Sequence, residues 1–160
     1  MDKTLQFDAR GNLFPATVQE VLWSDFESNF VLGNHRSKLC KNFRSFVMDI
    51  KREISPEFWV WVDGSFVGQK EIPHDIDALF LLGYRICERK KSVLDNVYFA
   101  GKQKYTEGLD LYYTAEYPES HKPHFLSHLN HLYWDDIYGH TRQDSNGKRF
   151  SKGYVKIKIV

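Results

Sequence analysis

The sequence lacks several features that define large classes of proteins. Its 160 residues include only two cysteines, five prolines and ten glycines, which excludes a disulfide scaffold, a collagen and a low-complexity disordered chain. No apolar run approaches the ~18 residues of a membrane span, and no hydrophobic stretch follows the first residues. We therefore expect no membrane segment and no signal peptide. The formal net charge of only +1 argues against a protein that coats polyanions generally.

The composition that is present is typical of a globular protein. Apolar residues make up 42% of the chain and aromatic residues 16%, and one domain of this length can bury a core without disulfides. We predict a single domain over residues 1–160. Cys40 and Cys87 lie far apart and form no CxxC motif, so we expect both to be buried, reduced thiols in a cytoplasmic protein.

Hydrophobic periodicity predicts a mixture of helices and strands. Helical spacing occurs in four segments: 17–32, about 34–54, 84–100 and 125–138. Strand patterns occur in four others: 58–62, 75–82, 109–114 and 153–160. The expected fold class is α/β or α+β, a mixed β-sheet flanked by helices, with an N-terminal helical segment (14–54) and a C-terminal helix and strand (125–160). Residues 142–150 are predicted to form an exposed polar loop.

Three aspartates stand where a charge is costly unless it has a partner. Asp75 and Asp77 are two residues apart on a predicted strand, so both side chains leave the same face. Like charges held this close raise each other's pKa unless a cation lies between them. Asp110 lies inside an apolar run, and it completes a three-carboxylate site if its strand lies beside residues 75–82. Because carboxylate oxygens suit Mg²⁺ or Mn²⁺, the three aspartates are candidate metal ligands and catalytic residues.

The turn that precedes Asp75 has the features of an anion-binding loop. Gly64 and Ser65 follow a buried strand, where backbone N–H groups can surround a phosphate. Lys70 adds a positive charge to the same loop. Tyr112 is expected to share the face of Asp110, where it either stacks on a base or packs in the core. The candidate nucleotide-binding residues are therefore Gly64, Ser65, Lys70 and Tyr112.

A known signature matches this pattern. Gly64-Ser65 is followed, after nine residues, by Asp75-Ile76-Asp77, and Asp110 stands on a later predicted strand. The arrangement resembles the signature of the DNA polymerase β-like nucleotidyltransferase superfamily over about residues 58–113. Within that superfamily the chain is most similar to an uncharacterised bacterial group of small stand-alone nucleotidyltransferase-like proteins. The residues that carry this closer similarity are Phe14-Pro15-Ala16-Thr17, Asp63-Gly64-Ser65-Phe66-Val67, Lys70, Pro73, Asp75-Ile76-Asp77, Tyr138-Gly139 and Lys152-Gly153.

The resemblance implies a minimal nucleotidyltransferase fold and a metal-dependent reaction. A nucleoside monophosphate would pass from a nucleoside triphosphate to an acceptor hydroxyl, with release of pyrophosphate. Asp75, Asp77 and Asp110 would hold two Mg²⁺ or Mn²⁺ ions, and Gly64 and Ser65 would hold the terminal phosphates. The acceptor stays open among a protein, an RNA and a small molecule.

An alternative is a non-catalytic binding protein on the same fold, such as an antitoxin-like subunit that neutralises a toxin-like partner. The three carboxylates favour activity, whereas the small size favours dependence on a protein partner. Four histidines add a further candidate site, because their spacing would place them on one face of a continuous helix: His121, His124, His128 and His131. Zinc is one interpretation. Surface or groove-lining imidazoles are favoured, because Pro123 interrupts the register and no cysteine lies nearby.

Charge is unevenly distributed along the chain. The two segments that contain the candidate aspartates, 53–84 and 105–141, each carry a net charge of −5, whereas residues 142–160 carry +5. Cationic segments beside an acidic centre are what a metal–triphosphate substrate requires.

Overall fold

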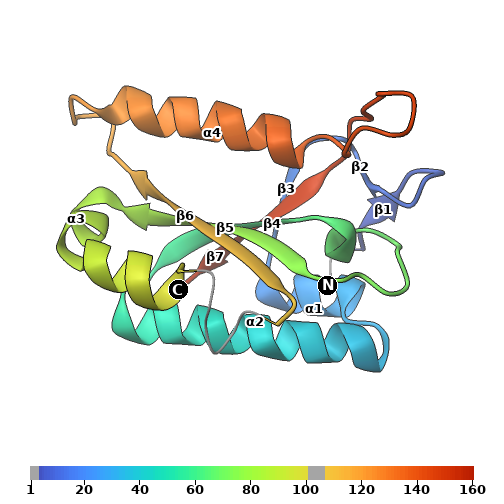
Figure 1. Cartoon of the computed structure of the whole chain (residues 1–160), viewed down its shortest axis with the longest axis horizontal. Helices are drawn as coiled ribbons and strands as arrows, with labels where there is room; N and C mark the ends of the chain where they lie inside the picture. Colours follow the sequence, from blue (N-terminus) through green and yellow to red (C-terminus); the bar gives the residue numbers. More distant parts are fainter. Residues whose placement is uncertain (1–3, 101–106) are drawn as a thin grey trace.

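The computed structural model describes residues 4–100 and 107–160, and it centres on a five-stranded mixed β-sheet (Figure 1). In sheet order the strands are β3 (Val18–Val21), β7 (Tyr154–Ile159), β4 (Phe58–Asp63), β5 (Ile76–Gly83) and β6 (Leu109–Glu116). The outer pairs, β3–β7 and β5–β6, are parallel, and the two inner pairs are antiparallel. The expected mixed α+β fold class is confirmed.

Helices cover both faces of the sheet (Figure 1). On one face lie α1 (Trp23–Phe30) and α2 (Gly33–Glu53), and on the other lies α4 (His124–Tyr138). The helix α3 (Tyr84–Val93) follows β5 directly and continues into a π-helical turn, η2 (Leu94–Tyr98). The apolar stripe predicted for the second helix is the buried face of α2, formed by Leu39, Phe43, Phe46, Val47 and Ile50.

The central strands are apolar on both faces because each face carries its own core. Successive side chains of a strand point to opposite faces. In β4, Val60 and Val62 therefore pack in the large core beneath α1 and α2, while Trp61 packs in a smaller core with Tyr138 of α4. The prediction of a strand at residues 58–62 that is buried on both faces is confirmed, with Trp59 half-buried.

The predicted helix over residues 17–32 is wrong in its first part. Residues 18–21 form β3, and α1 begins only at Trp23. Val18 and Val21 fit a helical stripe equally well, but they pair in parallel register with Tyr154 and Ile157 of β7. This long-range pairing overrides local spacing, as it often does for β-branched residues. The N-terminal segment is therefore not wholly helical, and it opens with an antiparallel ribbon of β1 (Gln6–Phe7) and β2 (Leu13–Phe14).

Several smaller expectations can be compared with the structure. Cys40 and Cys87 are buried and unpaired, as predicted. The predicted helix over residues 84–100 ends at Tyr98, and the last strand and the last helix lie within a residue or two of their predicted bounds. Among the described residues, no helix has the length and apolar character that a membrane crossing requires.

Candidate active site

Three aspartates form a row across neighbouring strands. The backbone register places Asp63 of β4 opposite Asp77 of β5, and Asp77 opposite Asp110 of β6. Directly paired residues project from the same face of a sheet, and neighbouring strands lie only about 4.7–4.9 Å apart. The predicted proximity of Asp77 and Asp110 is therefore confirmed, and Asp63 extends the row by one residue. Asp75 comes one residue before β5 begins, in the loop that leads into that strand.

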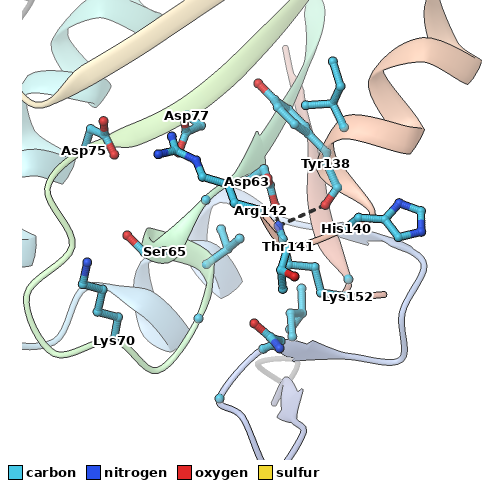
Figure 2. A pocket seen from close by; sticks show the side chains of 18 of the residues that line it. Asp63, Ser65, Lys70, Asp75, Asp77, Tyr138, His140, Thr141, Arg142 and Lys152 are labelled. Carbon is cyan, nitrogen blue, oxygen red and sulfur yellow. Dashed lines mark hydrogen bonds and ion pairs between the residues drawn. The ribbon is translucent and has the colours of Figure 1, made fainter. Parts of the chain in front are cut away.

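The carboxylates of this row influence one another strongly at Asp77. Burial is the largest cause that raises the pKa of Asp77 from 3.8 to about 6, followed by the charges of Asp75, Asp63 and Asp110. Arg142 opposes the shift, and its guanidinium lies beside Asp77 in Figure 2. A carboxylate with a pKa of about 6 is mostly ionised at neutral pH. A cation bound beside Asp77 would stabilise this ionised form.

Asp63 differs from the other aspartates because it has its own cation. The Lys152 ammonium forms an ion pair with the Asp63 carboxylate and donates a hydrogen bond to the backbone carbonyl of Tyr138 at 3.0 Å (Figure 2). Both charged side chains are about nine-tenths buried. Burial raises the pKa of Asp63, and the charge of Lys152 is the main effect that lowers it. Asp63 therefore anchors Lys152, and Asp75, Asp77 and Asp110 face the open side of the site.

Glycine is required at position 64 for two reasons. Gly64 has a φ of +78°, in the left-handed region that other residues rarely adopt. A Cβ atom there would also lie 1.8 Å from Oδ2 of Asp77. The turn thus brings its backbone directly against that carboxylate. The single helical turn that follows, η1 (Ser65–Val67), starts with Ser65, whose hydroxyl lies in the same pocket (Figure 2).

Arg36 holds the same loop from the opposite side. It is buried on α2, and its guanidinium donates four hydrogen bonds of 2.5–3.0 Å to backbone carbonyls. One acceptor is Phe30 at the end of α1, and the other three are Phe66, Gly68 and Lys70 of the loop. Hydrogen bonds from a charged donor are stronger than neutral ones. Arg36 therefore fixes the path of the loop between β4 and β5.

All the residues predicted from sequence to form the site line one pocket of about 1010 Å³. They are Gly64, Ser65, Lys70, Asp75, Asp77, Asp110 and Tyr112. Tyr112 is exposed on the same face as Asp110, with its ring 5.1 Å from that of Trp134. The pocket is large enough for a nucleotide. Its acidic row lies between a loop that carries Ser65 and Lys70 and an aromatic wall formed by Tyr112 and α4.

Sequence reasoning missed several other residues that line the pocket. Arg142 belongs to the segment predicted as a solvated loop, and the net charge of +5 on residues 142–160 was the available signal. Arg10 and Asn12 lie in the turn of the β1–β2 ribbon. The backbone of Gly11 in that turn accepts a hydrogen bond from Gln69 of the site loop at 2.9 Å. No local pattern marks these N-terminal residues, because they reach the site only through the tertiary fold.

The four histidines do not form a common site. His124 bonds the backbone carbonyl of Tyr117 at 2.8 Å, and His131 bonds the Glu116 carboxylate at 2.9 Å. His121 lies against the rings of Tyr84 and Tyr117, and His128 is exposed. Across residues 4–100 and 107–160, no group of three or more His, Cys, Asp or Glu side chains is arranged so that it could hold a metal ion. The zinc interpretation thus has no support in the described structure.

A family model was found by comparison with known proteins. The model described as "Family of unknown function (DUF6932)" matches residues 5–158. The chain belongs to this family. No curated protein and no solved structure matched the chain. The matched range includes every residue of the pocket, from Ala9 to Gly153, so the site described above lies wholly within the shared family region.

Proposed function

We propose that the chain is a metal-dependent nucleotidyltransferase with a minimal nucleotidyltransferase fold. It would transfer a nucleoside monophosphate from a nucleoside triphosphate to an acceptor hydroxyl and release pyrophosphate. The observation that carries the proposal is the paired register of Asp77 and Asp110 beside the Gly64-Ser65 turn. This register brings the two halves of the sequence signature into one pocket, although Ser65 and Asp110 are 45 positions apart in the sequence.

In the described residues Asp75, Asp77 and Asp110 are not arranged as a complete metal-binding group, so the magnesium ion of this proposal would arrive with its nucleotide and share its phosphates. In nucleotide sites Mg²⁺ is usually bound by one or two carboxylates together with substrate phosphates, and seldom by a complete protein cage. The raised pKa of Asp77 supports this interpretation, because carboxylates that repel one another leave a place for a cation. Asp75, Asp77 and Asp110 would hold Mg²⁺ or Mn²⁺. When bound, the ion would neutralise charge that develops on the triphosphate.

The remaining pocket residues fit the other parts of such a substrate. The Gly64-Ser65 turn would hold the terminal phosphates, and Lys70 and Arg142 would balance their charge. Tyr112 would stack against the base or sugar. The acceptor oxygen would attack the α-phosphorus as the bond to the β-phosphate oxygen breaks, so that pyrophosphate leaves. Asp110 would take the proton from the acceptor hydroxyl.

A cytoplasmic location is part of the proposal. The two buried cysteines of the described chain are both unpaired thiols, which is the usual state in a reducing compartment. Nucleoside triphosphates are also cytoplasmic substrates.

The proposal is tested by labelled nucleotides and one pair of variants. The protein is incubated with Mg²⁺ or Mn²⁺ and each α-labelled nucleoside triphosphate, alone and with RNA or small hydroxyl compounds. Labelled product and released pyrophosphate are then measured. Asp77→Asn is expected to lower the rate on the order of 100-fold or more, because it removes a charge from the centre of the site. The matched control is Asp49→Asn, since Asp49 pairs with Arg52 on α2, away from the pocket.

Nucleotide binding separates the two candidate functions. Calorimetry with Mg²⁺ and a triphosphate analogue that cannot be cleaved is expected to show binding to the wild type and weakened binding to Asp77→Asn. Binding without transfer to any acceptor would favour the non-catalytic alternative, a nucleotide-binding partner subunit. Absence of metal-dependent binding to the wild type would refute both the reaction and the nucleotide site.

A further inference from the structure

The helix α4 is apolar on both its inner and its outer side. On the inner side Trp134 and Tyr138 pack in the smaller core with Trp61. Polar contacts lie on its inner face: Asn130 donates to the Thr114 hydroxyl at 2.8 Å, and Ser127 accepts from a backbone N–H at 2.7 Å. The outer face is apolar. It carries six large hydrophobic side chains that are 37–62% exposed: Phe125, Leu126, Leu129, Leu132, Tyr133 and Ile137. Two of them, Tyr133 and Ile137, lie at the edge of this face and also line the pocket. A surface helix normally turns its apolar stripe toward the core, so an apolar outer face calls for an explanation.

We propose that the outer face of α4 is a dimerisation surface that packs antiparallel against α4 of a second copy of this chain. In Figure 1 the outer side of α4 is not covered by any other described element. The proposal concerns assembly and is independent of the proposed reaction.

The exposed area matches what a stable dimer requires. If a fully exposed side chain of this size presents about 200 Å², the six side chains present on the order of 600 Å² in each copy. Two copies would then bury about 1,200 Å² from these side chains alone, at the lower limit of specific interfaces. A patch of this extent is at the upper end of what monomeric proteins expose.

The charge distribution favours a second copy over another partner. In a two-fold symmetric contact, residues near the axis meet their own copies, so a charge there repels itself. From His124 to Trp134 the helix has no Asp, Glu, Lys or Arg. Charges of opposite sign flank this stretch, Lys122 before it and Asp135 and Asp136 after it, and all three are exposed. Asp136 also pairs with Arg149 of its own chain. An antiparallel pair centred on Leu129 places Lys122 of one copy near Asp136 of the other.

This geometry is tested by the mass of the assembly in solution. Light scattering and sedimentation are expected to give twice the 18.9 kDa of the chain. Leu129→Asp would place two like charges at the axis, and we expect it to raise the dimer dissociation constant more than about 100-fold. The matched control is Leu32→Asp, at an exposed leucine that directly precedes α2 on the other side of the sheet. It should leave the dimer intact.

Disulfide cross-linking tests the orientation and does not depend on how Leu129→Asp folds. Because Cys40 and Cys87 are buried, a new surface cysteine would be the reactive thiol. Leu129→Cys is expected to form a covalent dimer on mild oxidation. Phe125→Cys should not, since its two copies would be separated by about 12 Å along the helices, beyond the 4.4–6.8 Å of a disulfide.

Three results would overturn the proposal. The first is a monomer at every soluble concentration, whether or not another macromolecule covers the face. The second is a dimer that Leu129→Asp does not weaken. The third is cross-linking through Phe125→Cys: together with Leu129→Cys it would indicate parallel packing, and without it an antiparallel pair centred elsewhere on the helix.

Discussion

Replacing Asp77 by asparagine should stabilise the metal-free protein at neutral pH. Asp77 is surrounded by Asp75, Asp63 and Asp110, and its pKa is raised to about 6 by burial and by these charges. Asparagine has nearly the same shape but cannot ionise, so the variant removes the repulsion and keeps the packing. We therefore expect a protein that loses the proposed activity to gain stability, as is common for residues selected for function.

The size of the expected gain in stability follows from the pKa of Asp77. A tenfold change in an ionisation equilibrium corresponds to about 1.4 kcal/mol, so a pKa raised from 3.8 to about 6 corresponds to about 3 kcal/mol of unfavourable interaction. Water at the open side of the pocket screens part of it, and we expect a gain of about 1–3 kcal/mol at pH 8. The sign depends on protonation. Below pH 3.8 the carboxyl is protonated in both states and the gain vanishes. It grows between pH 3.8 and about 6, where the unfolded state has lost the proton and the folded state still holds it, and it is constant above about pH 6.

The measurement is the free energy of unfolding in urea from pH 4 to pH 8, with a chelator present. Wild type, Asp77→Asn and the control Asp49→Asn are compared, so that all groups common to the three proteins cancel in the differences. Adding Mg²⁺ should stabilise the wild type more than Asp77→Asn at pH 8. If Asp77→Asn is less stable than the wild type at pH 8, or if the difference does not depend on pH, the electrostatic interpretation of the aspartate row is wrong.

Two further substitutions test the supports of the site. Lys152→Met leaves the buried Asp63 carboxylate without its cation, and we expect a loss of about 3–5 kcal/mol in urea unfolding; a loss below about 1 kcal/mol would contradict the pairing. Arg36→Lys keeps the charge but not the planar fork that reaches four carbonyls, and we expect a loss of at least about 2 kcal/mol. Amide hydrogen exchange should become faster in residues 64–70 of that variant while α4 stays protected, and unchanged exchange in the loop would show that Arg36 does not hold it.

Much of the site could be predicted because its residues carry local signals. Asp75 and Asp77 are close in sequence, and Asp110 stands out as a charge in an apolar run. Their strands were recognisable from composition. To bring the aspartates together, the prediction then required only that β5 and β6 be neighbours in the sheet, which the paired register confirms. The Gly64-Ser65 turn had its own signal in the glycine that follows a buried strand.

The rest depends on contacts between distant parts of the chain. The Asp63–Lys152 pair joins residues 89 positions apart, and Arg36 reaches loop carbonyls 30–34 positions away. The residues next to Asp63, Lys152 and Arg36 in the sequence give no indication of either contact. The strand β3 was missed for the same reason, since it exists only because β7 lies beside it. Local sequence patterns predicted the helices and strands whose hydrophobic periodicity is strong. Where the periodicity is weak, pairing with a distant strand determines which structure forms.

The row of aspartates also constrains how the sheet can assemble. A slip of one residue in the pairing of a strand turns its side chains to the opposite face. For β4, β5 or β6 such a slip would move Asp63, Asp77 or Asp110 from the pocket into the phenylalanine-rich core beneath α2. A charge in that core would cost several kcal/mol. The same carboxylates that make the pocket acidic thus exclude misregistered sheets, so the acidity of the site and the uniqueness of the fold have a common origin.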